Sequence, residues 1–210
     1  MSKPLRIALT KGRLESDSVK LFEKAGLDCE NLKNKGRRLV LSVGDNLEAV
    51  LAKAADVITY VEYGVCELGI VGKDTILENS NSLYEVLDLG FGKCRFCIAA
   101  LDENILNTGY DSKRIASKYP RITKNYFERR GMDIDVIKIE GSVELAPILG
   151  LADAIADIVE TGTTLKENGL KIVEEICPIS ARLVVNTAAM KLRKREIEEF
   201  ISLLENAGRV

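Results

Sequence analysis

Near its start the chain contains the stretch LRIALTKGR, residues 5–13, an apolar run of strand length that ends in a short cationic turn. Helical spacing of apolar residues then predicts a helix over residues 16–25, with Ser16 as its cap and Gly26 at its end. The same order of strand, turn and helix repeats along the chain. This alternation is typical of an α/β protein, and it predicts mixed or largely parallel sheets with flanking helices.

Further elements follow from the same patterns. Strands are predicted at residues 39–43, 68–72, 83–89, 95–100, 114–117, 134–139 and 154–159, helices at 56–66, 122–130, 143–149 and 194–206, and one long extended segment at 171–185. Gly69 and Gly72 predict close contacts along their strand. The stretch Gly90–Lys93 is the predicted linker between two domains, because its glycines permit a crossover. A ligand is then expected in a crevice at the carboxyl ends of strands.

Composition excludes several classes of function. The 210 residues include 30 basic and 32 acidic side chains, so nucleic-acid binding by bulk neutralisation of phosphates is not expected. There is no histidine, which excludes Ser-His and Cys-His nucleophiles and histidine metal ligands. No apolar run is long enough for a membrane span. The five cysteines are an odd number without a signal peptide, so we expect a reduced, cytoplasmic setting.

The strongest local signal is DIVETGTT, residues 157–164, where two acids close a strand and threonines flank a glycine before a helix. Backbone N–H groups in such a turn form an anion nest, and threonine hydroxyls add donors. Acids beside the nest suit sugar hydroxyls, so a phosphorylated sugar fits the whole loop. The candidate residues are Asp157, Glu160, Thr161, Gly162, Thr163 and Thr164. A plain strand-to-helix turn with a threonine cap explains the same residues equally well.

A second candidate is the turn Lys11-Gly12-Arg13, which directly follows the first strand. Glycine lets the backbone approach a ligand, and the two cations suit a clamp for phosphate or another oxyanion. From the residues alone a solvated turn is the commoner explanation, as it is for Arg37 beside Arg38. Cys94 and Cys97 have neither a second cysteine pair nor a histidine, so a zinc or redox role is not expected.

Five motifs, in this order, resemble the ATP phosphoribosyltransferase family. They are ALTKGRL at 8–14, YGVCELGIVGKD at 63–74, RIASKYP at 114–120, EGSVELAP at 140–147 and DIVETGTTL at 157–165, the last one following GLAD at 150–153. Together they span nearly the whole chain. Their order makes the resemblance far more specific than a single Thr-Gly-Thr-Thr sequence.

The resemblance implies transfer of a phosphoribosyl group from phosphoribosyl pyrophosphate to N1 of ATP, with Mg²⁺, as the first step of histidine biosynthesis. It implies two lobes similar to type II periplasmic binding proteins, with the site in the cleft between them. Lobe I would comprise residues 1–90 and 178–210, and lobe II residues 91–177. The length resembles the short form of the family. This form implies a homodimeric core in a hetero-octamer, with a separate regulatory subunit similar to histidyl-tRNA synthetase, and no nucleic-acid or membrane partner.

The resemblance also implies roles for individual residues. Thr161, Gly162, Thr163 and Thr164 would hold the 5-phosphate, with Asp157 and Glu160 near the ribose hydroxyls. The catalytic residues would be Lys11, Arg13 and Arg37, which serve the pyrophosphate and the ATP phosphates. Weaker candidates for ATP binding are Gly12, Leu14, Asp74, Cys94 and Ser142, although Ser142 also suits a helix cap.

Other positions receive no role from the resemblance. No protein side chain is assigned to the metal, because Mg²⁺ would be carried by the substrate phosphates. The family usually has aspartate where Glu67 stands and arginine where Lys53 stands, so neither residue is assigned.

Two alternative functions stay open. A non-catalytic binding module shares the two-lobed architecture, but it leaves the loop and the cations without a common purpose. A phosphoribosyltransferase that acts on a nucleobase explains the loop, but the amino-terminal motifs do not suit it.

Transfer to ATP is compatible with a chain without histidine. N1 of adenine is already a nucleophile, so the reaction needs alignment and charge stabilisation rather than a strong base.

Overall fold

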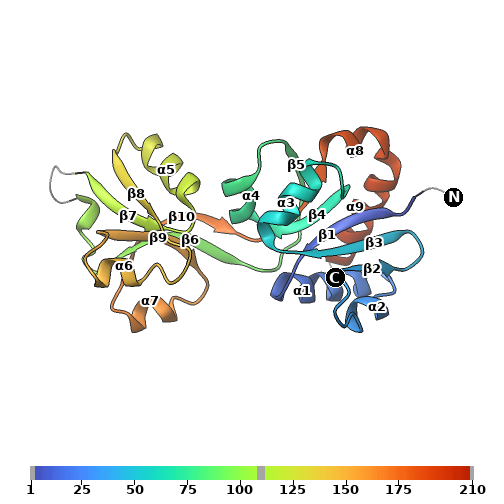
Figure 1. Cartoon of the computed structure of the whole chain (residues 1–210), viewed down its shortest axis with the longest axis horizontal. Coiled ribbons are helices and arrows are strands. Elements are labelled where there is room, and N and C mark those ends of the chain that lie inside the picture. Colours follow the sequence, from blue (N-terminus) through green and yellow to red (C-terminus); the bar gives the residue numbers. More distant parts are fainter. Residues whose placement is uncertain (1–2, 108–111, 209–210) are drawn as a thin grey trace. The chain divides into compact units, whose positions relative to one another are not determined.

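The computed structural model describes residues 3–107 and 112–208 (Figure 1). These residues form two compact units. Unit 1 contains the described residues up to Gly92 and from Ser180 onward, and unit 2 contains those from Lys93 to Ile179. The first boundary falls inside the stretch Gly90–Lys93, in which Gly90 and Gly92 have positive φ angles of 75° and 62°.

Unit 1 is a six-stranded sheet with helices on both faces (Figure 1). The strands, in spatial order, are β2 (Val40–Val43), β3 (Leu47–Ala52), β1 (Leu5–Thr10), β4 (Leu68–Gly72), β11 (Ala181–Asn186) and β5 (Leu83–Asp88). The helices are α1 (Arg13–Lys24), α2 (Glu30–Lys33), α3 (Ala54–Glu62), α4 (Lys73–Asn79), α8 (Thr187–Leu192) and α9 (Lys194–Gly208). Strand β1 runs parallel to β3 and β4, and the outer pairs are antiparallel.

The middle of the central strand β1, residues 7–9, is apolar and fully buried because helices cover both of its faces. Ile7 and Leu9 belong to a cluster with residues of α1 and α9, where the rings of Phe22 and Phe200 meet edge to face at 6.1 Å. Ala8 lies on the opposite face, in a cluster with residues of α3. A strand packed on both faces has a fixed direction and register. The turn that follows β1 is therefore positioned by the core.

Gly69 in β4 allows α3 to pack closely against the sheet. A Cβ at this position would lie 2.8 Å from Val61 Cγ2 and 2.9 Å from Val57 Cγ1, closer than side chains normally approach. At Gly72 a Cβ would lie 2.1 Å from Asp74 Oδ1. The prediction of close contacts at both glycines is confirmed.

Unit 2 is a five-stranded sheet, also covered on both faces. Its strands, in spatial order, are β10 (Lys171–Ile179), β6 (Cys94–Ala100), β9 (Ala154–Val159), β7 (Lys113–Ser117) and β8 (Ile134–Lys138). Its helices are α5 (Pro120–Arg129), α6 (Leu145–Ile148) and α7 (Thr163–Glu167), with a 3₁₀ turn at Ile105–Asn107. Side chains of α5 pack on one face of the sheet, and those of α6 and α7 pack on the other.

The predicted strands agree with the structure to within one residue at each end, and the sheets are mixed. Among the described strands, four of the nine adjacent pairs are parallel. The first helix begins at Arg13 rather than at Ser16, and Gly12 is its cap. Ser16 therefore lies inside α1, where its backbone N–H donates to Gly12 O at 3.1 Å. The prediction of Ser16 as the cap was wrong.

Two other expectations need correction, and some elements were missed. The extended segment 171–185 is two strands in different sheets, β10 and β11, separated at Ser180. The helix expected at 143–149 is limited to the single turn of α6. Strand β3 and helices α2, α4 and α8 were not predicted. The helix α2 is a single turn, and α4 and α8 are each shorter than two turns and follow a strand directly. Within the described residues, no helix is long and apolar enough to cross a membrane.

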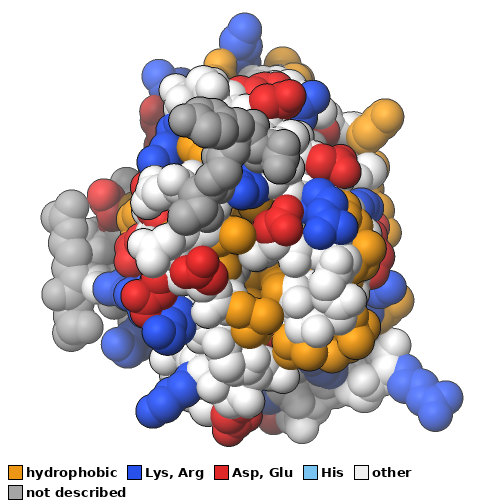
Figure 2. Space-filling model, turned by 90° about the vertical axis from the view of Figure 1, so that its left-hand side faces the viewer, with side chains coloured by type: hydrophobic (Ala, Val, Ile, Leu, Met, Phe, Trp, Pro, Cys, Tyr) orange, Lys and Arg blue, Asp and Glu red, His pale blue; other side chains and the backbone are white. Residues whose placement is uncertain are grey.

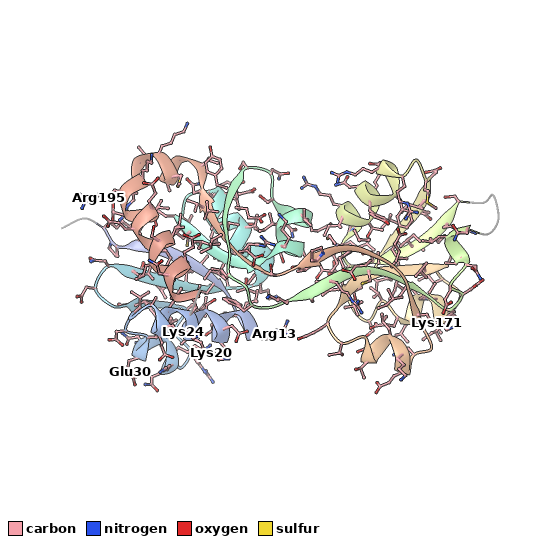
Figure 3. All side chains as sticks on the ribbon, turned by 180° about the vertical axis from the view of Figure 1, so that it is seen from behind. Arg13, Lys20, Lys24, Glu30, Lys171 and Arg195 are labelled. Carbon is pink, nitrogen blue, oxygen red and sulfur yellow. The ribbon has the colours of Figure 1, made fainter. Side chains whose placement is uncertain are left out.

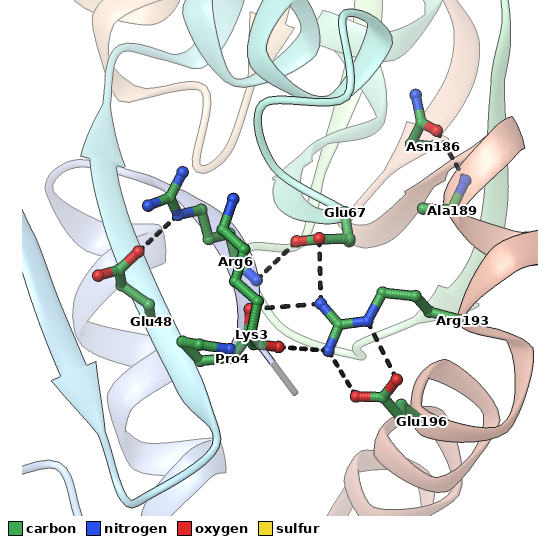
Figure 4. Close-up of polar contacts among 9 residues, drawn as sticks. All are labelled: Lys3, Pro4, Arg6, Glu48, Glu67, Asn186, Ala189, Arg193 and Glu196. Carbon is green, nitrogen blue, oxygen red and sulfur yellow. Dashed lines mark hydrogen bonds and ion pairs between the residues drawn. The ribbon is translucent and has the colours of Figure 1, made fainter. Parts of the chain in front are cut away.

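Arg193 connects three segments of unit 1 (Figure 4). Its guanidinium donates to Glu67 Oε1 at 3.1 Å, to the Lys3 carbonyl at 2.7 Å and to both carboxylate oxygens of Glu196. The second oxygen of Glu67 accepts a bond from the Arg6 N–H at 2.8 Å. The side chains of Arg193 and Glu67 are mostly buried, at 17% and 16% exposed. This network fixes the beginning of β1 to the start of α9, and it gives Glu67 a structural role.

Replacing Arg193 is expected to destabilise unit 1. Arg193→Met keeps the apolar stem but leaves the Glu67 and Glu196 carboxylates without their guanidinium, which costs about 2 kcal/mol of unfolding free energy. Urea denaturation followed by circular dichroism measures this loss. Arg195→Met is the matched control, because Arg195 is 91% exposed and pairs only with Glu199 within its own helix. An equal loss in both variants would show that the network contributes nothing.

Candidate functional site

Three strand-to-helix turns share one feature, a glycine at the helix cap. Gly12 connects β1 to α1, Gly72 connects β4 to α4, and Gly162 connects β9 to α7, and none of the three helices receives a side-chain cap bond from its cap residue. By contrast, Asn186 caps α8 with its side chain, which accepts from the N–H groups of Ala188 and Ala189. A glycine cap offers no side-chain acceptor, so donors of the first turn can be available to a ligand. In α4 the Lys73 N–H instead donates to the Ser180 carbonyl at 3.0 Å.

The loop after β9 forms a small cavity of about 250 Å³, which is lined by Glu144 and residues 157–165. Gly162 has a φ of +79°, which turns the backbone sharply into α7. The hydroxyl oxygens of Thr161 and Thr163 lie 3.0 Å apart, and the Thr163 N–H donates to Thr161 Oγ1 at 3.3 Å. Thr161, Thr163 and Thr164 are exposed. The loop therefore presents hydroxyl and N–H donors together, as a bound phosphate requires.

Three carboxylates accompany these donors. Asp157 is half-buried and accepts a bond from the N–H of Ile158 at 2.8 Å, and Glu160 is exposed. Glu144 comes from the segment before α6 and lines the same cavity. It had no assigned role, and the only hint in the sequence was its place in the EGSVELAP motif. Ser142 is exposed in that motif and does not line the cavity.

In unit 1, the turn after β1 is anchored by the core and presents its cations to solvent. The Lys11 N–H donates to the Ala52 carbonyl at 2.9 Å, and Gly12 has a φ of +98°. Lys11 is exposed, and so is Arg13, whose side chain projects from the first turn of α1 (Figure 3). Lys53 follows Ala52 at the end of β3, so a third exposed cation lies beside this turn. The sequence had given Lys53 no role.

The weaker candidates fall into different environments. Asp74 is buried, follows the adjacent strand β4 at the same edge of the sheet, and accepts from Thr75 Oγ1 at 3.2 Å. Leu14 packs against the core of unit 1 and close to Gly92. Cys94 begins β6, whose Arg95 pairs with Val159, so it lies at the edge of unit 2 where the loop begins.

The two cysteines of the Cys94-x-x-Cys97 sequence lie on opposite faces of their sheet. Cys97 belongs to the cluster on the side of α6 and α7, whereas Cys94 packs against the cluster on the side of α5. Burial raises the pKa of the Cys97 thiol, and burial raises the pKa of Cys66 to about 11. Burial therefore keeps the Cys97 thiol protonated near neutral pH, which disfavours nucleophilic chemistry at this cysteine.

A larger cavity, of about 790 Å³, lies at the other end of β1. It is lined by Lys3 to Leu5, Val43 to Leu47 and residues of α9. None of the residues selected from the sequence lines it. Volume alone therefore does not identify the site, and the choice depends on the donors at the carboxyl ends of the strands.

The fold and these loops define a two-unit α/β protein whose exposed turns suit phosphorylated ligands. The family model "HisG: ATP phosphoribosyltransferase" matches residues 53–206. An ATP phosphoribosyltransferase of Clostridium kluyveri is 58% identical over 204 residues, covering 97% of this chain and 93% of that protein. The chain belongs to the ATP phosphoribosyltransferase family, which catalyses the first step of histidine biosynthesis, and it is a transferase.

Solved structures agree with this assignment. The ATP phosphoribosyl transferase (HisG:HisZ) complex from Thermotoga maritima contains a chain that is 33% identical, with a TM-score of 0.83 and 98% of both chains covered. The periplasmic aliphatic sulphonate binding protein SsuA from Escherichia coli is 11% identical, with a TM-score of 0.60 over 99% of this chain and 73% of its own. The second likeness shows the fold alone. The expected similarity to periplasmic binding proteins is confirmed.

Gly162→Ala is expected to impair phosphate binding by the loop. A Cβ there has room, since its nearest neighbour is Val159 Cγ1 at 3.7 Å, but the left-handed backbone disfavours it by about 1 kcal/mol. Relaxation of that backbone would redirect the loop donors and weaken binding of phosphoribosyl pyrophosphate about tenfold. Isothermal titration calorimetry measures the affinity.

Gly169→Ala is the matched control, because Gly169 has a φ of +74°, lies in the same unit and has equal room for a Cβ. It should cost the same stability without changing the affinity. Equal affinities in the two variants would remove the loop from the site.

Proposed function

We propose that the loop 161–164 binds the 5-phosphate of phosphoribosyl pyrophosphate, and that Asp157 and Glu160 accept bonds from its ribose hydroxyls. The observation that carries this proposal is the loop cavity itself, where threonine hydroxyls and the first N–H groups of α7 accompany carboxylates. A phosphate needs the donors and a sugar diol needs the acceptors. A free inorganic anion has no sugar hydroxyls to donate to the carboxylates, so it would not explain their presence in the cavity.

The cations of unit 1 are assigned to the other phosphates. Lys11 and Arg13 are exposed beside a glycine turn, and Arg37 is exposed in the segment between α2 and β2. These charges neutralise the departing pyrophosphate and hold the ATP phosphates. Guanidinium groups suit this task because they donate to two phosphate oxygens at once. Asp74 and Gly12, at the ends of adjacent strands, are proposed near the ATP.

The transfer joins N1 of adenine to C1 of the ribose and breaks the bond between C1 and the pyrophosphate oxygen. The electron pair leaves with the pyrophosphate, so negative charge develops on the leaving group. The protein must align the two substrates and stabilise that charge. No imidazole base is needed, which agrees with a chain that has no histidine.

A divalent metal ion belongs to the reaction of this family. Among the described residues, no three acidic or cysteine side chains are grouped so that they could hold such an ion. Mg²⁺ is commonly bound through substrate phosphates and only one or two carboxylates. We therefore assign it to the pyrophosphate of the substrate, where it would neutralise phosphate charge, and Asp157 and Glu160 are the loop carboxylates that could contribute a ligand.

We also propose a separate regulatory subunit, because the solved relative is a HisG:HisZ complex. Unit 2 exposes Leu145, Ile148, Leu149 and Leu151 on and directly after α6, and exposed apolar side chains this close together favour a protein partner. Figure 2 shows hydrophobic side chains grouped among charged ones on the face that it presents. All five cysteines are free, which supports a reducing, cytoplasmic setting.

Single substitutions separate the roles of the loop and the cations. Thr161→Ala and Thr164→Val should raise the KM for phosphoribosyl pyrophosphate, whereas Lys11→Ala and Arg13→Ala should lower kcat about 10²–10³-fold, by analogy with a lost oxyanion donor. The assay follows the ultraviolet absorbance of the N1-substituted adenine nucleotide in the presence of Mg²⁺ and pyrophosphatase. Lys20→Ala is a control on the same helix as Arg13, since Lys20 is exposed and, among residues 3–107 and 112–208, forms an ion pair with Asp17 alone.

Two results would contradict these assignments. Wild-type kinetics in both threonine variants would remove the loop from the phosphoribosyl site. Binding of both substrates by the wild-type chain, with and without a regulatory subunit, but no turnover would favour a non-catalytic binding module.

Activity is expected to depend on the regulatory subunit. Light scattering after size-exclusion chromatography would give a homodimer mass for this chain alone and a larger, mixed assembly when the regulatory subunit is added. The same mixture should show increased turnover. An unchanged mass and rate would argue against a separate subunit.

A further inference from the structure

Glu15 is a buried carboxylate at the start of α1. It lies directly beside the cations proposed to bind substrate phosphates, Lys11, Arg13 and Arg37, which are called the cationic clamp below. The side chain is only 8% exposed. One oxygen, Oε2, accepts from the Gly12 N–H at 3.4 Å and so bonds to the turn that carries Lys11 and Arg13. The other oxygen, Oε1, forms an ion pair with Lys35 Nζ. Glu15 therefore contacts two segments that are more than twenty positions apart in the sequence.

Lys35 lies in the short segment that carries Arg37. This segment is further ordered by Arg38, whose guanidinium donates to the Asn34 carbonyl at 2.9 Å and to the Lys35 carbonyl at 3.2 Å. Arg37 thus stands between Lys35, which is paired to α1, and Arg38, which is bonded to the segment itself. Beyond this point the Leu39 carbonyl accepts from the Leu51 N–H at 2.8 Å. The position of the Arg37 backbone is fixed from both sides.

We infer that Glu15 is a positioning residue that holds the Lys11-Gly12-Arg13 turn and the Arg37 segment together, so that their cations engage one polyanionic substrate. This inference rests on the proposed function of those cations. A buried acid beside an anion site opposes binding by its charge, and Lys35 offsets that charge. If charge alone mattered, a neutral residue at this position would give a higher affinity for the anion. The carboxylate is therefore explained by the position in which it holds its two partners.

An electrostatic role and a positioning role for Glu15 predict opposite changes in the affinity for a polyanion when this residue is replaced. Glu15→Gln keeps the shape and an oxygen acceptor for Gly12, but it removes one negative charge and the ion pair with Lys35. Electrostatics alone predicts tighter binding of a polyanion by this variant. Positioning predicts weaker binding, because the Arg37 segment is released from α1 and must be ordered again when the ligand binds.

A double variant removes the charge difference altogether. Glu15→Gln combined with Lys35→Met deletes one negative and one positive charge, so the net charge of the clamp is unchanged. Lys33→Met is the matched control, because Lys33 of α2 also pairs with α1, through Glu23 near the opposite end of that helix. It breaks the same kind of bond at a distance from the proposed clamp. Lys35→Arg keeps the charge and tests rescue by a conservative residue.

The experiment titrates inorganic pyrophosphate, in the presence of Mg²⁺, into the full chain by isothermal titration calorimetry. Glu15→Gln and the double variant should each raise Kd about fivefold or more, as expected for loss of a coupling between two groups of contacts. Lys35→Arg should lie within about twofold of wild type, and Lys33→Met should not change Kd. Melting temperatures establish that each variant is folded. Should Glu15→Gln fail to fold, Lys35→Met against Lys35→Arg gives the comparison, since Lys35 is more exposed.

The outcomes separate this inference from the function on which it rests. Arg13→Ala and Arg37→Ala are measured alongside. Weaker binding in both, with wild-type affinity in the double variant, would overturn the role of Glu15 and leave the clamp in place. Unchanged binding in Arg13→Ala and Arg37→Ala would overturn the clamp and the role of Glu15 together. Tighter binding by Glu15→Gln would show that its charge, and not its position, affects the ligand.

Discussion

Unsatisfied N–H groups at the beginning of a helix are the constraint on which the candidate site depends. A helix must satisfy the donors of its first turn with a side chain, with water or with a ligand. Where α8 is purely structural, the Asn186 side chain fills this role. At Gly12, Gly72 and Gly162 the cap has no side chain to offer. The same glycines lack the Cβ that would hold a phosphate away from the backbone, so the backbone is accessible at Gly12 and Gly162. Gly72 is buried, and the Lys73 N–H that follows it already donates to the Ser180 carbonyl at 3.0 Å.

The location of these turns follows from the strand order. In unit 1, β1 is parallel to β4, so their carboxyl ends meet at one edge and bring Lys11 and Asp74 to it. In unit 2, β6 is antiparallel to β9, so its beginning lies beside the end of β9, which places Cys94 near the loop. A chain with a net charge of only −2 needs no overall positive field for such sites. Backbone donors and a few local cations provide the attraction, at distances where screening by salt is weak.

The sequence predicted most strands well because a buried strand has a continuous apolar sequence, as at residues 68–72. Prediction from the sequence failed where the local pattern suggested one element boundary and contacts with distant segments set another. Ser16 is a good capping residue, yet α1 starts at Arg13, because β1 ends at Thr10 and the glycine turn leads directly into the helix. Residues 171–185 are extended throughout, and only pairing partners distant in the sequence divide them into β10 and β11.

The same limit applies to the candidate site. The loop 157–164 is local, so its residues could be selected from sequence, and the structure places them around one cavity. Lys53 lies beside the Lys11 turn through pairing between β1 and β3, and Glu144 reaches the cavity from the segment before α6. Both positions depend on contacts between segments far apart in the sequence. Glu67 was assigned no role from the sequence, and the structure gives it one. Its carboxylate accepts bonds from the Arg6 N–H and from Arg193, at the end of β1 opposite to Lys11. The glutamate side chain reaches both partners, so this residue anchors the beginning of β1, whereas the candidate cations follow the other end of the same strand.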